Sequence, residues 1–186
     1  KKMENLIVDL RNMTLNIRML PIGTIFGKFR RLVRDLSKDL GKEVELITEG
    51  DETELDKTVI ERLQDPLVHL IRNSMDHGIE EPAERKRKGK PGLGKIYLRA
   101  IHSGAEVLIK ISDDGKGLRR EPIYAKALSK GLITPGKEMS EGEIYNLIFL
   151  PGFSTATQVT DVSGRGVGMD VVKKTIDSLG GAIEIE

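Results

Sequence analysis

Apolar residues recur at every third or fourth position in the first 20 residues of the chain. They are Met3, Leu6, Leu10, Met13, Ile17 and Leu20. A seam this narrow is typical of helices that pack in coiled coils and helix bundles. It predicts that residues 1–20 are the end of a helical dimerisation segment, with packing of this helix on its own domain as the alternative. Pro21 and Gly23 interrupt the pattern, so residues 21–186 are expected to form a separate domain.

Helix and strand patterns alternate in the next part of the chain. A second apolar stripe predicts a helix over residues 25–40, and Gly41 marks its end. The segment VELIT, at residues 44–48, has the composition of a strand. PAERKRKG, at residues 82–89, predicts a short basic helix or loop whose charges are solvated. Two strand patterns follow, KIYLRAIH and AEVLIKIS, and the Ser103-Gly104 pair between them is a strong signal for a β-hairpin.

The segment DPLVHLIRNSMDHGIE, at residues 65–80, is the most informative stretch of the sequence. Asp56 is placed to cap a short helix, KTVIERL, before it. A second helix is predicted to begin with Asp65 as its cap and Pro66 in its first turn, and to end at Gly78. One face of that helix carries Leu67, Leu70, Ile71 and Ser74. The opposite face carries His69, Asn73, Asp76 and His77. A solvated polar face would explain this pattern by itself, but two glycine-rich segments farther along favour a nucleotide site.

The last third of the chain is predicted to hold three helices, a long loop and a final strand. Helix patterns occur at residues 122–131, after the capping-box sequence that begins at Ser140, and after Gly168. Between the last two helices, LPGFSTATQVTDVSGRGVG has no hydrophobic period and is interpreted as a functional loop. The final residues, AIEIE, alternate as a strand does. Because the chain starts within a helical pattern and ends within a strand pattern, we expect it to be a piece of a longer soluble protein.

Composition narrows the class of protein. The 186 residues are 38% apolar and 32% charged, which suits a globular domain. The formal net charge of +1 does not favour a nucleic acid or a membrane surface as a partner. The absence of cysteine excludes disulfides and thiolate metal sites, and it fits a reducing compartment such as the cytoplasm. No apolar run approaches the roughly 20 residues of a membrane span, so no membrane insertion is expected.

Two glycine-rich segments carry candidate nucleotide chemistry. GRGVG, at residues 164–168, precedes a predicted helix whose first N–H groups could bind a phosphate. It is neither a dinucleotide fingerprint, because no strand leads into it, nor a Walker A loop, because the lysine and hydroxyl are missing. DDGKG, at residues 113–117, closes a predicted strand with a carboxylate that could accept a hydrogen bond from an adenine amino group. Each segment alone could also be an ordinary turn.

The polar face of residues 65–80 offers a metal ligand and positive charge. Asn73 has an amide oxygen suited to Mg²⁺, which takes few protein ligands together with water and phosphate oxygens. His69, one turn earlier, could orient or deprotonate an attacking group. Arg72 and His77 could offer positive charge to phosphates. A zinc site is not predicted, because no third compatible ligand is suitably spaced.

The three motifs occur in the order of a known family. H-x-x-x-N on a helix, then D-x-G-x-G, then G-x-G-x-G before a helix, resembles the N, G1 and G2 boxes of the Bergerat ATP-binding fold, which gyrase, the heat-shock chaperone, histidine kinases and mismatch-repair ATPases share. IFLPGFST resembles the F box of histidine kinases, and HLIRNSMDHGIE and RMLPIGTIF are similar to the chemotaxis histidine kinases specifically. This resemblance implies a two-layer α/β sandwich, with a mixed, mostly antiparallel sheet covered by helices on one face and an N-terminal helical segment before it.

Carried over by position, the resemblance implies a site for ATP and Mg²⁺. Asn73 would bind Mg²⁺, Asp113 would bond the adenine, and His69 would be the catalytic residue. The residues expected to bind nucleotide are Arg72, Asn73, Asp76, His77, Asp113, Gly115, Gly117, Gly164, Gly166 and Gly168. Leu150 to Ser163 corresponds to the lid over the nucleotide.

The implied function is that of a protein histidine kinase, which transfers the γ-phosphate of ATP to a histidine on a separate domain. His69 stands where hydrolytic members of the superfamily carry a glutamate general base, which favours phosphoryl transfer over hydrolysis. No histidine precedes His69, so the acceptor is expected on a domain outside this sequence. The implied partners are that phosphoacceptor domain, response regulators, a receptor and a coupling protein, and a second copy in a homodimer. The alternatives are an ATPase that drives a conformational cycle and a non-catalytic nucleotide-binding dimerisation module.

Overall fold

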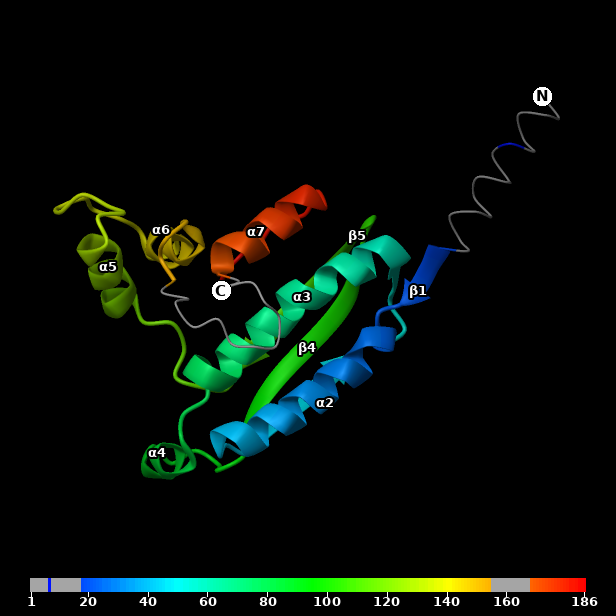
Figure 1. Cartoon of the computed structure of the whole chain (residues 1–186), viewed down its shortest axis with the longest axis horizontal. Coiled ribbons are helices and arrows are strands. Elements are labelled where there is room, and N and C mark those ends of the chain that lie inside the picture. Colours follow the sequence, from blue (N-terminus) through cyan, green and yellow to red (C-terminus); the bar gives the residue numbers. More distant parts are fainter. Residues whose placement is uncertain (1–6, 8–17, 155–167) are drawn as a thin grey trace. The chain divides into compact units, whose positions relative to one another are not determined.

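The computed structural model describes residue 7, residues 18–154 and residues 168–186. The chain divides into two compact units, Lys1–Lys116 and Gly117–Glu186 (Figure 1). Helices and strands both contribute to the first unit, so the predicted α/β class is confirmed. No helix among the described residues is long and apolar enough to cross a lipid bilayer.

A three-stranded sheet in the order β2-β4-β5 forms the base of the first unit. Its strands are β2 (Val44–Glu49), β4 (Gly94–Ser103) and β5 (Glu106–Asp113). β2 runs parallel to β4 and β5 runs antiparallel to it, so the sheet is mixed, as predicted. The predicted hairpin is confirmed, and it turns at Gly104, whose φ of 63° favours glycine. The register places Asp113, the last residue of β5, opposite Ile96.

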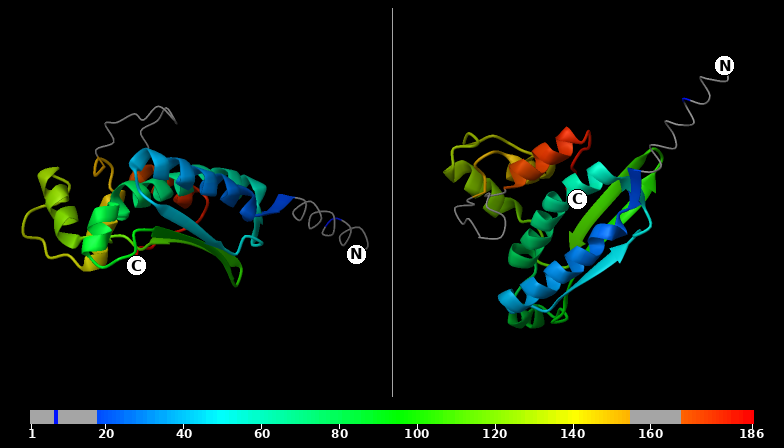
Figure 2. Two further views of the ribbon diagram at one scale, coloured as in Figure 1. Left: turned by 90° about the horizontal axis from the view of Figure 1, so that it is seen from below. Right: turned by 45° about the vertical axis from the view of Figure 1, so that its right-hand side comes forward.

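Two long helices, α2 (Gly23–Leu40) and α3 (Lys57–Asn73), cover one face of this sheet (Figures 1 and 2). Alternate residues of β4 are buried on that face, which is the pattern of a strand covered on one side. The core between the helices and the sheet contains Phe26, Phe29, Val33, Leu63, Leu67, Ile71, Ile96 and Leu98. Burial of each such side chain contributes on the order of 1.5–3 kcal/mol.

The central helix differs from its predicted form. α3 is continuous from Lys57 and contains Pro66, so the prediction that Asp65 caps a separate helix is wrong. Asp56 is the N-cap, as predicted for the preceding segment, and its carboxylate accepts a hydrogen bond from Thr58 N–H at 2.8 Å. The helix continues through the proline because one apolar stripe, buried before and after it, packs against the core. A π-helical turn, η1 (Ser74–Gly78), and the short helix α4 (Pro82–Arg87) follow α3.

A small sheet, not predicted from the sequence, lies near the start of the first unit. It consists of β1 (Met19–Pro21) and β3 (Glu54–Asp56), which pair in antiparallel orientation with Leu20 opposite Leu55. Leu20 was expected to end the N-terminal helical seam, and its place in a strand corrects that expectation. The other residues of the seam lie outside the described residues, so the dimerisation segment stays a prediction.

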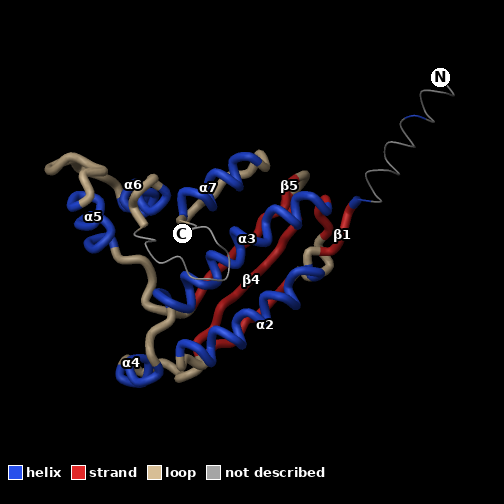
Figure 3. The backbone as a smooth tube through the Cα atoms, in the orientation of Figure 1, coloured by secondary structure: helices blue, strands red, loops and turns tan. Residues whose placement is uncertain are grey.

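The described residues of the second unit contain α-helices at the three predicted places and one additional 3₁₀ turn (Figure 3). They are α5 (Arg120–Ser129), α6 (Glu141–Asn146), η2 (Leu147–Phe149) and α7 (Met169–Ser178). Their buried core is formed by Ile123, Ala127, Ile144, Leu147 and Phe153. The predicted capping box is confirmed, because the side chains and backbone N–H groups of Ser140 and Glu143 bond reciprocally. The predicted strand at residues 182–186 is wrong, since alternation yields a strand only where a neighbouring edge pairs with it.

Candidate nucleotide site

The carboxylate of Asp113 lies against the backbone of two glycines. A Cβ atom at Gly78 would lie 2.9 Å from Asp113 Oδ2, and one at Gly115 would lie 2.1 Å from the carbonyl oxygen of Gly78. Gly115 N–H donates a hydrogen bond to Asp113 Oδ1 at 3.0 Å, and Lys116 N–H donates one to the Gly78 carbonyl at 3.0 Å. The structure therefore brings the DDGKG turn onto the end of the α3–η1 segment, and at Gly115 the backbone of Gly78 leaves no room for a Cβ atom.

The polar residues predicted on the central helix lie in α3 and η1, the segment that ends at Gly78. His69 and Asn73 are half-buried and one helical turn apart, and Arg72 is also half-buried. Asp76 and His77 lie in η1 and are exposed. Burial lowers the pKa of His69 below its ordinary value of 6.5, and the positive charge of Arg72 lowers it further. His69 is therefore neutral at pH 7.

Lys42 holds the π-helical turn η1 through its backbone carbonyl groups. It directly follows the glycine that ends α2, and it is buried. Its Nζ donates hydrogen bonds to the carbonyl oxygens of Met75, Asp76 and Ile79 at 2.8, 3.1 and 2.8 Å. A lysine ammonium has three donors, so these contacts satisfy all of them. No local pattern identifies Lys42, because its partners lie more than 30 residues away.

A buried ionic network links the segment after η1 to the DDGKG turn. It corrects the prediction that the basic run at residues 82–89 is solvated. Arg85 of α4 is 1% exposed and pairs with Glu80 at 3.2 Å and with Asp114 at 2.9 Å. Lys90 pairs with Glu80 at 2.9 Å. The basic segment was expected to be solvated because it is short and highly charged. One of its positive charges, that of Arg85, instead neutralises the carboxylates of Glu80 and Asp114, and Lys90, directly after the run, joins the same network.

Because of this network, the stability of the first unit should decrease as the pH falls into the acid range. Burial would raise the pKa of Glu80, but the hydrogen bonds from Lys90 and Lys88 and the charge of Lys90 lower it from 4.5 to about 2. A carboxyl whose pKa is lower in the folded state stabilises the fold above its unfolded pKa, and this contribution is lost as the pH falls toward the folded pKa. The lowering of the Glu80 pKa from 4.5 to about 2 corresponds to about 3 kcal/mol of unfolding free energy.

We expect Glu80→Gln to flatten the pH dependence of unfolding. Wild-type stability in urea should fall between about pH 5 and about pH 3 by part of that amount, whereas the variant should lose less over the same interval. Glu106→Gln is a suitable control, since that side chain is exposed at the start of β5, at the end of the strand away from Asp114. Parallel curves for wild type and Glu80→Gln would contradict the assignment.

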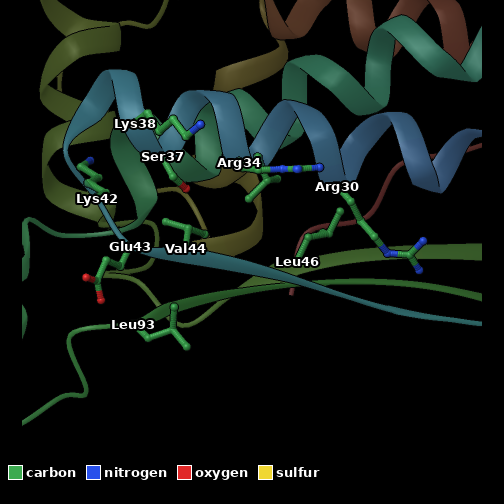
Figure 4. Close-up of a pocket in the computed structure, with 10 residues that line it drawn as sticks. Arg30, Arg34, Ser37, Lys38, Lys42, Glu43, Val44, Leu46 and Leu93 are labelled. Atoms are coloured by element: carbon green, nitrogen blue, oxygen red, sulfur yellow. The ribbon is translucent and has the colours of Figure 1, made fainter.

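A groove between α2 and β2 is a separate feature (Figure 4). Arg34 and Lys38 of α2 and Val44 and Leu46 of β2 line it. None of the residues predicted to bind nucleotide lines this groove. The groove therefore does not coincide with the nucleotide site predicted from the sequence.

Residues 62–186 match the protein family described as histidine kinase-, DNA gyrase B- and HSP90-like ATPases. The chain belongs to this family. The matched segment includes the polar half of α3, the DDGKG turn and the start of α7, so it covers every residue predicted here to bind nucleotide. The family match thus confirms the predicted superfamily, and it spans the N, G1 and G2 boxes that carried the resemblance.

Individual relatives are similar over nearly the whole chain. The chemotaxis protein CheA of Bacillus subtilis is 52% identical over 188 residues, covering 100% of this chain and 28% of the relative. The sensor histidine kinase CheAY of Helicobacter pylori is 55% identical, covering 96% and 22%, and CheA of Salmonella typhimurium is 54% identical, covering 96% and 26%. The chain therefore spans about a quarter of the length of these relatives. A histidine kinase domain from Erythrobacter litoralis EL346 superimposes with a TM-score of 0.41 at 16% identity, over 69% of this chain and 54% of that one.

The remaining predicted residues of this ATPase-family domain belong to the second unit. Gly117 is exposed, with a φ of 71°. Gly168 is the N-cap of α7, where a Cβ atom would lie 2.6 Å from Asp170 Oδ1. Gly164 and Gly166 lie outside the described residues, as does most of the predicted lid. Their roles toward a nucleotide stay predictions.

The residues of the first unit fit the ligands that the family implies. A carboxylate held by one N–H at Oδ1 keeps its second oxygen as an acceptor, which suits an exocyclic amine. No cluster of three acidic or histidine side chains suited to a metal occurs within the described part of the chain. A magnesium ion that arrives with a nucleotide does not need such a cluster, because phosphate and water oxygens fill most of its coordination sites.

Proposed function

We propose that this chain is the ATP-binding catalytic domain of a chemotaxis histidine kinase. In this proposal it transfers the γ-phosphate of Mg·ATP to a histidine on a separate domain of the same protein. The observation that carries the proposal is the Asp113 carboxylate docked on Gly78 and Gly115, in a chain of the ATPase family. The similarity to chemotaxis kinases of three bacteria supports the choice of reaction.

In this proposal each residue of the first unit has a defined task. Asp113 accepts the hydrogen bond of the adenine amino group, and Gly115 keeps the turn close against Gly78 beside the base. Asn73 supplies one oxygen ligand to the magnesium ion, whose charge would stabilise the transferring phosphoryl group. Arg72, Asp76 and His77 complete the polar surface around the phosphates. Catalysis of phosphoryl transfer then depends on positioning and electrostatics more than on covalent chemistry.

His69 favours transfer to a histidine over hydrolysis of ATP. A general base is weakened when its conjugate acid has a lowered pKa, and burial together with Arg72 lowers the pKa of His69. A neutral imidazole of this kind activates water less well than a carboxylate placed for the purpose. The same side chain can still donate a hydrogen bond, so it can orient a phosphate oxygen or the attacking imidazole.

The acceptor histidine belongs to another domain in this proposal. The chain has three histidines, His69, His77 and His102, and none precedes α3. His69 is half-buried in the candidate site, and His102 lies near the end of β4. We further infer a cytoplasmic location, a homodimer through residues 1–20, and response regulators, a receptor and a coupling protein as partners of the whole protein.

A transfer experiment tests the proposed function. The chain is incubated with labelled Mg·ATP, with and without the histidine-bearing domain of its own full-length protein. We expect acid-labile, base-stable label on the added domain and none on the chain itself. Transfer should be slow, because the separate pieces lack the linkage that raises the effective concentration of the acceptor. Free phosphate without labelled acceptor would favour the ATPase alternative, and absence of ATP binding would favour the non-catalytic one.

Asp113→Asn should weaken ATP and ADP by the same factor. The amide oxygen can still accept the hydrogen bond from Gly115 N–H, so the change acts at the second oxygen, where an N–H₂ group would face another donor. A buried donor left unpaired costs about 1–3 kcal/mol, or about 5- to 150-fold in affinity. Calorimetric titration measures this, with the exposed Asp35→Asn as the control. Equal affinity of wild type and variant would remove Asp113 from the site.

A further inference from the structure

The side chains of Arg85 and Lys90 hold the DDGKG turn. Arg85 Nη2 contacts the carboxylate of Asp114 at 2.9 Å, and Nη1 contacts the carbonyl oxygen of the same residue at 3.3 Å. Nη1 also contacts Glu80 Oε1 at 3.2 Å. Nε donates to the Pro91 carbonyl at 2.8 Å, and Nη2 to the Leu93 carbonyl at 3.3 Å. One planar guanidinium thereby joins α4, the loop before β4 and the turn after β5.

Lys90 anchors the next residues of the same turn. Its Nζ donates to the carbonyl oxygens of Asp114 and Gly115 at 3.0 and 2.8 Å, and to Glu80 Oε2 at 2.9 Å. Asp114 Oδ1 accepts a further hydrogen bond from Lys95 N–H at 2.9 Å. The carbonyl groups of Asp114 and Gly115 are therefore both fixed by charge-assisted hydrogen bonds, which are stronger than those between neutral groups.

The position of the Asp113 carboxylate depends on this anchoring. The carboxylate is held by Gly115 N–H, which belongs to one of the anchored residues. The turn must also keep Gly115 in close approach to Gly78, where no Cβ atom fits. A shift of the turn by a few tenths of an ångström would therefore move the carboxylate relative to any bound base. Binding groups lose effectiveness when the residues that support them are removed.

We propose that Arg85 and Lys90 are positioning residues that set the selectivity of Asp113 for the 6-amino group of adenine, an inference that rests on the proposed function. They do not touch the nucleotide. Their removal leaves the phosphate-binding residues in place and loosens the base-binding carboxylate. The expected signature is a loss of discrimination between bases, with binding of the triphosphate retained.

The experiment compares ATP with purine riboside triphosphate, which lacks the 6-amino group. Calorimetry gives the dissociation constant of each nucleotide for wild type, Arg85→Lys and Lys90→Met. Arg85→Lys keeps the charge and loses the planar fork of donors. Lys90→Met keeps much of the side-chain volume, and Lys88 remains as a partner of Glu80. The ratio of the two constants should fall by about 10-fold in each variant, a size typical for removal of a supporting residue.

Matched controls lie on the same short helix. Lys86→Met and Arg87→Lys change exposed cations of α4 and should leave the ratio unchanged. The ratio is insensitive to a fraction of unfolded protein, because both nucleotides are measured on one preparation. A network with a merely structural role would lower the amount of competent protein and leave the ratio as in wild type.

The outcomes separate this inference from the proposed function. If wild type does not discriminate between the two nucleotides, or Asp113→Asn does not remove discrimination, the assignment of the adenine site fails. If both behave as proposed while Arg85→Lys and Lys90→Met keep the wild-type ratio, the positioning inference alone is overturned. It is also overturned if neither variant folds, because the network is then required for the fold as a whole.

Discussion

Asn73→Ala should reduce Mg²⁺-dependent phosphotransfer by at least about 100-fold, because in the proposed function a magnesium ion held by Asn73 would supply several kcal/mol of charge stabilisation to the transferring group. Asn73 is the last residue of α3 and is half-buried, so truncation removes little of the core. Alanine is also the best helix former. The fold should therefore persist, and the loss should appear in the rate and in the Mg²⁺ dependence of nucleotide binding.

Asn146→Ala is a closely matched control for this change. Asn146 is likewise the last residue of a helix, α6, and it is exposed in the second unit. The control should keep wild-type activity and Mg²⁺ dependence. Circular dichroism and a urea titration establish that both variants are folded. An Asn73→Ala protein that unfolds, or that transfers phosphate at the wild-type rate, would contradict the metal assignment.

Local sequence signals were sufficient for most of the elements. The hairpin around Ser103-Gly104, the end of α2 at Gly41 and the capping box at Ser140 are each fixed by residues close together in the chain. Such signals act through neighbouring backbone groups, so they can be read without knowledge of the fold. The recognition of Asp113 and Asn73 as site candidates rested on motif order, and the family match includes both.

Predictions failed where distant contacts override local preference. Pro66 is a local helix-start signal, yet the apolar stripe that packs on the core carries α3 through it. Charge runs are usually solvated, yet Arg85 is buried because Glu80 and Asp114 fold around it. Lys42 likewise gains its role from carbonyl groups of η1. In each case the decisive partner is supplied by tertiary packing, which no local pattern in one sequence reveals.

Gly115→Ala should damage both stability and nucleotide binding, although it adds only one methyl group. The glycine is required by space rather than by its backbone angle, since Gly115 is not among the described glycines with positive φ. An added Cβ atom would lie 2.1 Å from the Gly78 carbonyl oxygen and 2.8 Å from Asp113 Oδ1. The turn must move away from Gly78 to relieve these contacts, which breaks the hydrogen bond from Lys116 N–H. We expect about 1–3 kcal/mol of lost stability.

Gly115→Ala should lower the affinity for ATP by more than its cost in unfolding free energy alone would suggest. A turn displaced from Gly78 carries the Asp113 carboxylate with it, so ATP affinity should fall by at least about 100-fold, at 1.4 kcal/mol per factor of ten. Gly27→Ala is the control, because Gly27 lies exposed in α2 with open space around its Cβ position. That change should raise stability by up to about 1 kcal/mol and leave ATP binding unchanged. Gly115→Ala with wild-type affinity would show that the close approach of the two glycines does not shape the site.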